Sequence, residues 1–77
     1  MTQLDWKDVF GDNLASILQE KGFTQLRLSR DSGVSTAMIS DYINKRSVPG
    51  LFAAINIAYA LDMSLDELVN FDEPIEW

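Results

Sequence analysis

The segment from Thr24 to Lys45 places two short helical stretches on either side of Gly33, with almost no room for a loop. Thr24 and Ser35 each predict a helix start and Gly33 a helix end, because threonine and serine cap helix N-termini and glycine adopts the left-handed conformation that ends helices. Such a step lets two helices cross steeply, with Val34 filling the angle between them. This segment constrains the fold more than any other.

Apolar residues elsewhere recur at three- and four-residue spacings rather than in alternation, which indicates helices. Gly22 and the Pro49-Gly50 pair mark breaks, and Ser64 with Glu67 forms a capping box. The sequence therefore predicts an all-α domain of five helices, over about residues 5–21, 25–32, 36–45, 51–61 and 65–69. We expect one domain over residues 1–77, with the two-helix step at about 24–45 and an acidic tail at about 70–77.

Composition excludes several classes of protein. The chain has no cysteine and no histidine, which rules out disulfides, thiolate metal sites and nucleophile–histidine catalysis. The first ten residues carry two aspartates before any apolar run, unlike a signal peptide. No stretch approaches the roughly 20 apolar residues that span a bilayer. We expect a soluble, cytoplasmic protein that is not an enzyme, has no cofactor or metal, and does not contact membranes.

The net charge of −6 disfavours a generic nucleic-acid binder, because affinity for duplex DNA depends on lysine and arginine. The charges, however, are unevenly distributed. All six basic residues lie within residues 1–46, where six acidic residues balance them, and residues 47–77 hold six acidic residues and no base. The sequence therefore predicts a dipolar molecule with a near-neutral, locally basic end.

The predicted helix over 36–45 has two different faces. At about 100° per residue, one side carries Met38, Ile39, Tyr42 and Ile43, and we expect the first three in the core. The opposite side is polar and short, and carries Thr36, Ala37, Ser40, Asp41 and Asn44. Short side chains let a helix approach base edges in a DNA major groove.

From about Phe10 to Val69 the sequence resembles the phage-repressor-like (lambda repressor-like, Xre-type) helix-turn-helix family. The matching elements stand in order at the family's spacings: Thr24-Gln25, Leu28, Ser29, Gly33-Val34-Ser35, Ile39-Ser40, residues 42–46 with Pro49, residues 57–61 and residues 64–68. The resemblance implies a five-helix domain that binds double-stranded DNA.

The resemblance also implies roles for individual residues. Phosphate contacts would fall on Thr24, Gln25, Asn44, Lys45 and Arg46. Base edges would be read by Thr36, Ala37, Ser40 and Asp41. The free N–H groups at the start of the helix over 25–32 would favour a phosphate as well.

Asp41 departs from the common family pattern, in which arginine or glutamine is frequent among the reading positions. Two interpretations remain open and are compatible: Asp41 accepts a hydrogen bond from cytosine N4, or it pairs with Lys45 four residues on. Specificity would then depend on Thr36 and Ala37 meeting thymine methyl groups, on water, or on DNA shape.

The predicted helix over 51–61 is apolar on two sides. Leu51, Ala54, Ile57, Ala58 and Leu61 are expected to face the core. Phe52, Ile55 and Tyr59 form a second apolar face about 135° away. Either Trp6, Ile75 and Trp77 of the terminal segments cover that face, or it forms a dimer contact together with Trp77.

The sequence thus predicts a sequence-specific, dimeric transcriptional regulator, a repressor of bacterial or phage (prophage) origin that occupies a palindromic DNA operator. The alternative is a protein-interaction module on the same fold, an antitoxin or adaptor with weak or no DNA binding. The acidic total, Asp41 and the second apolar face favour this alternative. The operator, the regulated genes, any inducer and the completeness of the chain are not specified by the sequence.

Overall fold

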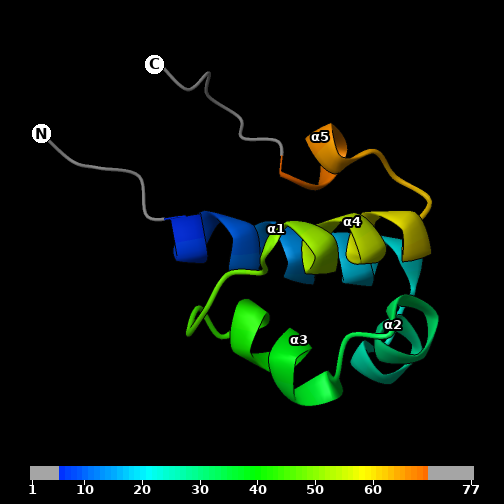
Figure 1. The fold of residues 1–77 in the computed structure, drawn as a ribbon, viewed down its shortest axis with the longest axis horizontal. Helices are drawn as coiled ribbons and strands as arrows, with labels where there is room; N and C mark the ends of the chain where they lie inside the picture. Colours follow the sequence, from blue (N-terminus) through cyan, green and yellow to red (C-terminus); the bar gives the residue numbers. More distant parts are fainter. Residues whose placement is uncertain (1–5, 70–77) are drawn as a thin grey trace, which may run out of the picture.

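The computed structural model describes residues 6–69, which form five helices. These are α1 (Trp6–Lys21), α2 (Gln25–Ser32), α3 (Thr36–Ile43), α4 (Leu51–Ala60) and α5 (Leu65–Leu68). α3 packs against α1 and α2, α2 packs against α4, and α5 packs against α4. α2 and α3 therefore lie together on one side of the molecule and α5 lies on the other (Figure 1). The expected all-α, five-helix fold is confirmed.

One apolar core joins these helices. Its fully buried large side chains are Phe10, Leu14, Leu28, Ile39, Tyr42, Ile57, Leu61 and Leu68. The rings of Phe10 and Tyr42 meet edge to face, with centroids 6.1 Å apart, and so connect α1 to α3. Burial, and secondarily the charge of Asp41, raises the pKa of the Tyr42 phenol above its ordinary value.

The predicted helix caps are present. Thr24, Ser35 and Ser64 each accept a hydrogen bond from the backbone N–H three residues on. At α5 the Glu67 carboxylate in turn accepts a hydrogen bond from the Ser64 backbone N–H at 3.1 Å, which completes the capping box. These bonds to Ser64 lower the pKa of Glu67, and the charge of Lys21 lowers it further.

Three expectations are wrong in detail. The third helix ends at Ile43 rather than at about Lys45, because Lys45 adopts a left-handed conformation with φ 67°. Met38 is 48% exposed, since it lies about 90° around α3 from the middle of the buried face. Leu51 is 64% exposed, because as the first residue of α4 it lines an open hollow with Val48 and Pro49.

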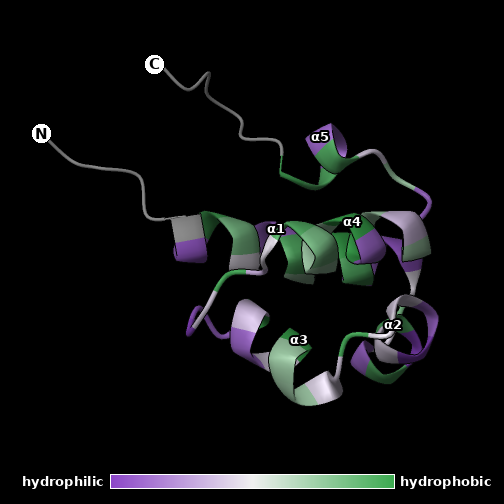
Figure 2. Cartoon of the chain, in the orientation of Figure 1, coloured by the Kyte–Doolittle hydropathy of each residue, from purple (hydrophilic) through white to green (hydrophobic). Residues whose placement is uncertain are grey.

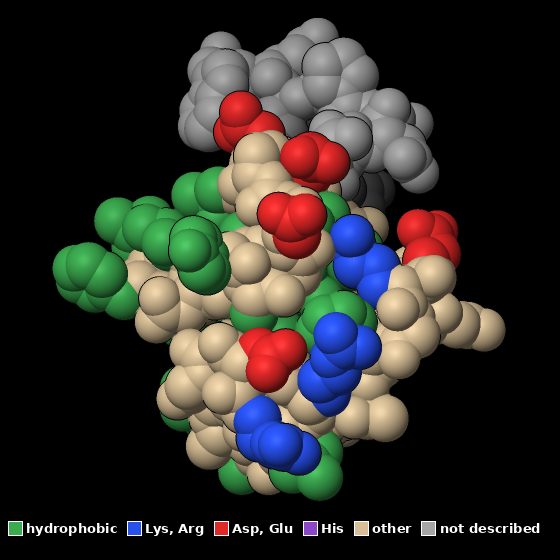
Figure 3. All heavy atoms as spheres, turned by 90° about the vertical axis from the view of Figure 1, so that its right-hand side faces the viewer, with side chains coloured by type: hydrophobic (Ala, Val, Ile, Leu, Met, Phe, Trp, Pro, Cys, Tyr) green, Lys and Arg blue, Asp and Glu red, His purple; other side chains and the backbone are tan. Residues whose placement is uncertain are grey.

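Charge is unevenly distributed over the described residues. Asp62, Asp66 and Glu67 are exposed on α5 and on the turn before it, away from α2 and α3. Figure 3 shows this arrangement on one face, with most acidic side chains toward α5 and the lysines and arginines lower, toward α2. The remaining acidic residues of the tail, Asp72, Glu73 and Glu76, lie outside the described residues.

Within residues 6–69, no helix has the length and apolar character needed to cross a membrane. The same residues contain no cluster of three or more acidic side chains suited to holding a metal ion.

Candidate nucleic-acid interface

The connection between α2 and α3 is a tight turn held by three hydrogen bonds. Gly33 adopts φ 77°, and its N–H donates to the Ser29 carbonyl at 2.9 Å. The buried Ser32 hydroxyl accepts from the Val34 N–H at 3.1 Å, and Val34 itself is buried in the angle between the helices. The Ser35 hydroxyl then accepts from the Met38 N–H at 3.2 Å and starts α3. The sequence therefore fixes the relative direction of the two helices within three residues.

The start of α2 presents polar groups to solvent. Thr24 is the cap, and its hydroxyl accepts from the Arg27 N–H at 3.0 Å, so this side chain is engaged within the protein. Gln25 is exposed in the first turn, where unpaired backbone N–H groups favour an anion. The proposed phosphate contacts of both residues stay predictions.

Arg27 is a residue that the motif comparison did not single out. Its guanidinium carbon lies 3.9 Å from the centroid of the Phe23 ring, and its Nε lies 3.7 Å from an Asp31 carboxylate oxygen. These contacts hold a largely exposed cation beside the start of α2, near Gln25. Its position two residues after Gln25 could have indicated a cation near the predicted phosphate contact, but its stacking on Phe23 is seen only in the structure.

The outer face of α3 carries the residues predicted to read bases. Thr36 and Ala37 are exposed in the first turn, and Ser40 and Asp41 are half-buried one turn later. All four lie on one helix of eight residues, so the structure brings the predicted reading set together. Their contacts with base edges stay predictions.

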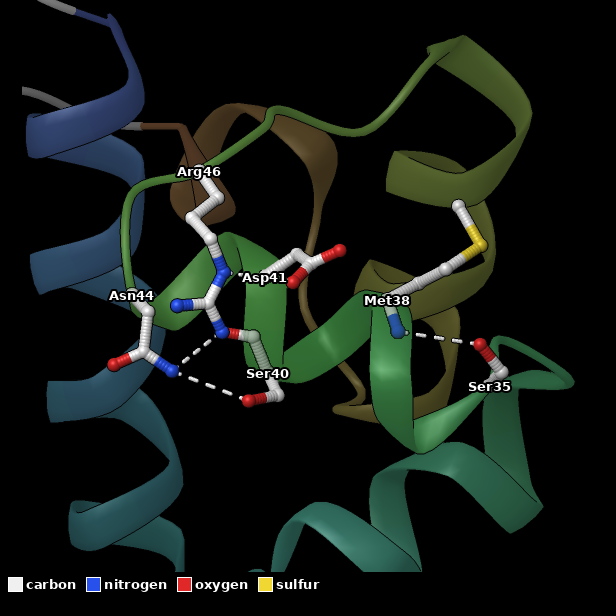
Figure 4. Close-up of polar contacts among 6 residues, drawn as sticks. All are labelled: Ser35, Met38, Ser40, Asp41, Asn44 and Arg46. Atoms are coloured by element: carbon white, nitrogen blue, oxygen red, sulfur yellow. Dashed lines mark hydrogen bonds and ion pairs between the residues drawn. The ribbon is translucent and has the colours of Figure 1, made fainter.

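The ion pairs at the end of α3 differ from the predicted one. One of the two interpretations of Asp41 was an ion pair with Lys45, but its Oδ1 lies 3.0 Å from Arg46 Nε (Figure 4). Lys45 instead places its Nζ 3.0 Å from Asp12 Oδ1 on α1. The Asp41–Lys45 prediction is wrong because α3 ends before Lys45, so the i,i+4 geometry of a helix does not apply there.

Asn44 is the cap residue that follows α3, and its side-chain amide bonds to the helix. Its Nδ2 donates to the Ser40 carbonyl at 2.8 Å and to the Ser40 hydroxyl at 3.1 Å (Figure 4). The Asn44 amide nitrogen is therefore engaged with Ser40 within the protein. Arg46, with 63% of its side chain exposed, is the cation at this end that faces solvent most. The phosphate roles of both residues stay predictions.

The second apolar face of α4 lies open. Phe52 is 81% exposed and Tyr59 86%, with Ile55 at 43% between them, and α4 is strongly hydrophobic along most of its length (Figure 2). A hollow of about 160 Å³ beside this face is lined by Ile55, Ala58, Tyr59, Met63 and Leu65. Two predictions for this face lie outside the described residues. One is that it is covered by the Trp6 side chain, Ile75 and Trp77, and the other is that Trp77 takes part in a dimer contact.

Known proteins resemble this chain in fold and in sequence motif. Its structure is similar to the restriction-modification controller protein C.AhdI from Aeromonas hydrophila, with a TM-score of 0.77 and 26% identity over 80% of this chain and 94% of that one. It is also similar to the hypothetical transcription factor NHTF from Neisseria, with a TM-score of 0.77 and 25% identity over 90% of this chain and 84% of that one. No curated protein matches the sequence.

The sequence itself matches a family model. Residues 14–68, which include α2, α3 and the tight turn between them, match the model described as helix-turn-helix. This is a family of DNA-binding regulators and not of enzymes, as the sequence motif had predicted. The chain belongs to the helix-turn-helix family of DNA-binding domains.

Proposed function

We propose that this protein is a sequence-specific transcriptional regulator that binds a palindromic operator as a homodimer, with α3 of each copy in the major groove. It acts as a repressor by occupying its operator in the cytoplasm, at the nucleoid, and residues 1–77 form one regulatory domain. The likeness to a restriction-modification controller protein and to a hypothetical transcription factor supports a regulatory role.

The observation that carries this proposal is the geometry of the α2–α3 unit. Thr36 and Ala37 are the exposed tip of α3, and no large side chain among residues 36–41 of its outer face prevents close approach to base edges. The N-terminus of α2 and Gln25 lie one short helix away, where they are suited to the adjacent phosphate backbone. One helix therefore reads the groove while the other holds the backbone.

A second copy of the chain is the occupant that we propose for the open face of α4. Phe52 and Tyr59 lie at equal sequence distance from the midpoint between Ile55 and Asn56. If two α4 helices pack antiparallel with a two-fold axis at that midpoint, Phe52 of each copy meets Tyr59 of the other and the two Ile55 side chains meet at the axis. This is the self-complementary contact that a two-fold dimer requires, and antiparallel helix dipoles favour it.

The available area suits such a dimer. Aromatic side chains bury roughly 150–250 Å² each, so the four exposed rings of two copies would remove on the order of 600–1,000 Å² from water. Val48, Leu51 and Ile55, all more than 40% exposed, supply further apolar area toward the roughly 1,200 Å² of a stable specific interface. The hollow of about 160 Å³ beside Tyr59 lies where the partner's phenyl ring would enter, and an apolar cavity of roughly 150 Å³ accepts a benzene ring.

Alanine substitutions of Gln25 and Arg46 test the phosphate contacts. Arg46→Ala is expected to weaken operator binding and to reduce the slope of log affinity against log salt concentration by about one per copy, because one cation fewer displaces counterions. Gln25→Ala is expected to weaken binding with little change in slope, since glutamine is neutral. Both measurements use fluorescence anisotropy over a salt series, in which the unsubstituted protein should show a slope of roughly −3 to −5 per copy.

Lys21→Ala is the matched control for Arg46→Ala. Lys21 ends α1 close enough to Glu67 to lower its pKa, so it lies toward α5 and away from the reading helix. The Lys21→Ala variant removes the same charge as Arg46→Ala, and we expect it to leave the slope of log affinity against log salt concentration within a few tenths of the parent value. A parent protein whose DNA binding does not depend on salt would contradict the proposed interface.

The second candidate function is a protein-interaction module that uses the α4 face for a different partner. The exposure of Phe52 and Tyr59, and the ion pair that neutralises Arg46 with Asp41, favour it. An adaptor of this kind should keep its function when Gln25 and Arg46 are both alanine, whereas the regulator should lose operator binding while it remains folded.

A further inference from the structure

Lys45 occupies a backbone position that normally belongs to glycine. It follows the Asn44 cap of α3 with φ 67°, in the left-handed region that disfavours side chains. Its N–H donates to the Tyr42 carbonyl at 3.2 Å, and the Arg46 N–H donates to the Asp41 carbonyl at 2.8 Å. This pair of bonds is the usual ending of a helix at a glycine. A lysine in that place costs backbone energy that an interaction of its side chain can offset.

The compensating interaction is with α1. Lys45 Nζ lies 3.0 Å from Asp12 Oδ1, and this bond raises the pKa of the Lys45 ammonium above its ordinary value. The aliphatic part of the side chain lies over Gly11: a Cβ added to Gly11 would sit 3.0 Å from Lys45 Cγ. The same Cβ would sit only 2.7 Å from the Tyr42 carbonyl oxygen, so α1 and the end of α3 are in close backbone contact there.

These contacts fix the second end of the reading helix. α3 has eight residues, and its first end is already held by the turn through Gly33 and Ser35. Gly11, Asp12 and Lys45 hold its other end against α1. Both ends of this short helix are therefore held, and together with its buried face on the core they set the direction of its outer face relative to the rest of the domain.

We propose that Lys45 is a positioning residue for DNA recognition rather than a phosphate contact, with Asp12 and Gly11 as its anchor on α1. The ammonium that the family motif assigns to phosphate is bound on the α1 side. Arg46 pairs with Asp41 but has 63% of its side chain exposed, so it is the cation at this end of α3 that DNA would meet first. Asp12, an acidic residue on another helix, thereby becomes a determinant of specific DNA binding. The inference rests on the proposed DNA-binding function.

Asp12→Asn, Lys45→Met and the double variant test this inference. Methionine keeps the aliphatic part of the side chain and the same backbone cost, and removes only the charge. Each single variant is expected to reduce the ratio of operator affinity to nonspecific affinity by about two- to fivefold, which is the range an exposed ion pair can impose. The double variant should be no worse than either single variant, and the salt slope should not change.

The two single variants change the net charge in opposite directions, which separates positioning from long-range electrostatics. Electrostatics alone would strengthen DNA binding by Asp12→Asn and weaken it by Lys45→Met, and Glu20→Gln and Lys21→Met are controls with the same charge changes. The inference is supported if both Asp12→Asn and Lys45→Met lower the ratio of operator affinity to nonspecific affinity. The measurement is made at a temperature where circular dichroism shows all variants folded.

Other outcomes overturn it. If Asp12→Asn binds the operator more tightly and Lys45→Met lowers the salt slope by about one, Lys45 is a phosphate contact for which Asp12 competes. If both variants keep the parent's affinity ratio, the ion pair is structural only. If the parent protein itself selects no DNA sequence, the proposed function is overturned as well. If the parent selects a sequence and only the variants behave otherwise than predicted, the positioning role alone fails.

Gly11→Ala is a stronger variant of the same test. The added methyl group forces the Tyr42 carbonyl away from α1, and we expect a loss of tenfold or more in the affinity ratio of the folded fraction. Ser16→Ala, on the exposed side of α1, raises helix propensity in the same direction and is the control. An unchanged ratio in folded Gly11→Ala protein would show that the α1–α3 contact does not direct the reading helix.

Discussion

An Ala37→Glu variant is expected to fold like the parent protein and to lose operator binding by two orders of magnitude or more. Ala37 is exposed in the first turn of α3, at the tip of the proposed reading face. A carboxylate there would enter the groove between two rows of phosphates without a partner, and an unpaired charge at a desolvated interface costs several kcal/mol. Fluorescence anisotropy with a selected operator measures the loss.

The stability of the variant should be close to that of the parent, because a carboxylate in the first turn of a helix interacts favourably with the helix dipole. Ala15→Glu, an exposed position on α1, introduces the same residue outside the proposed interface. It should bind the operator within a few-fold of the parent. If Ala37→Glu and Ala15→Glu bind DNA equally well, α3 is not the reading helix.

Substitution of the α4 face is expected to have an effect of similar size by a different route. Phe52→Lys and Tyr59→Glu should each convert the dimer to a monomer, because each introduces charges into the apolar contact of both copies. Loss of the second copy removes the gain of linked binding to two half-sites, which is of the order of 10² to 10⁴ in affinity. Analytical ultracentrifugation and operator binding measure the two effects separately.

The double variant Phe52→Lys with Tyr59→Glu tests the antiparallel arrangement. In that arrangement each introduced lysine lies opposite the partner's introduced glutamate, so two symmetric ion pairs form and dimerisation should recover in part. In a parallel arrangement each introduced residue meets its own copy, and like charges repel. Recovery therefore supports the proposed two-fold axis near residues 55–56, whereas single variants that remain dimeric would place the dimer contact elsewhere.

Much of the fold follows from local sequence. Thr24, Ser35 and Ser64 cap their helices as predicted, and Gly33 adopts the left-handed conformation that the turn requires. These features depend on residues within four positions of one another, so the sequence pattern was sufficient to predict them. The polar face of α3 was predicted for the same reason, since helical periodicity alone places its members on one side. The base-reading role of that face comes from the family resemblance and stays a prediction.

The errors lie where contacts distant in sequence determine the result. Lys45 resembles a helix residue, and nothing local indicates that it turns toward Asp12, 33 positions earlier. The close approach of Gly11 to the end of α3 is part of the same contact between α1 and α3. Met38 and Leu51 were assigned to the core by periodicity, but Met38 lies to one side of the buried face of α3, and Leu51, the first residue of α4, lines an open hollow.

Selection of bound sites from a random pool of double-stranded DNA tests the central claim most directly. The proposed regulator should enrich a palindrome whose two half-sites lie about one helical turn, or roughly 34 Å, apart, because two α3 helices related by a two-fold axis enter successive major grooves. Enrichment of such a site by the parent, and its loss in Ala37→Glu, is the predicted result. A pool that remains random after repeated selection would contradict sequence-specific DNA binding by this protein.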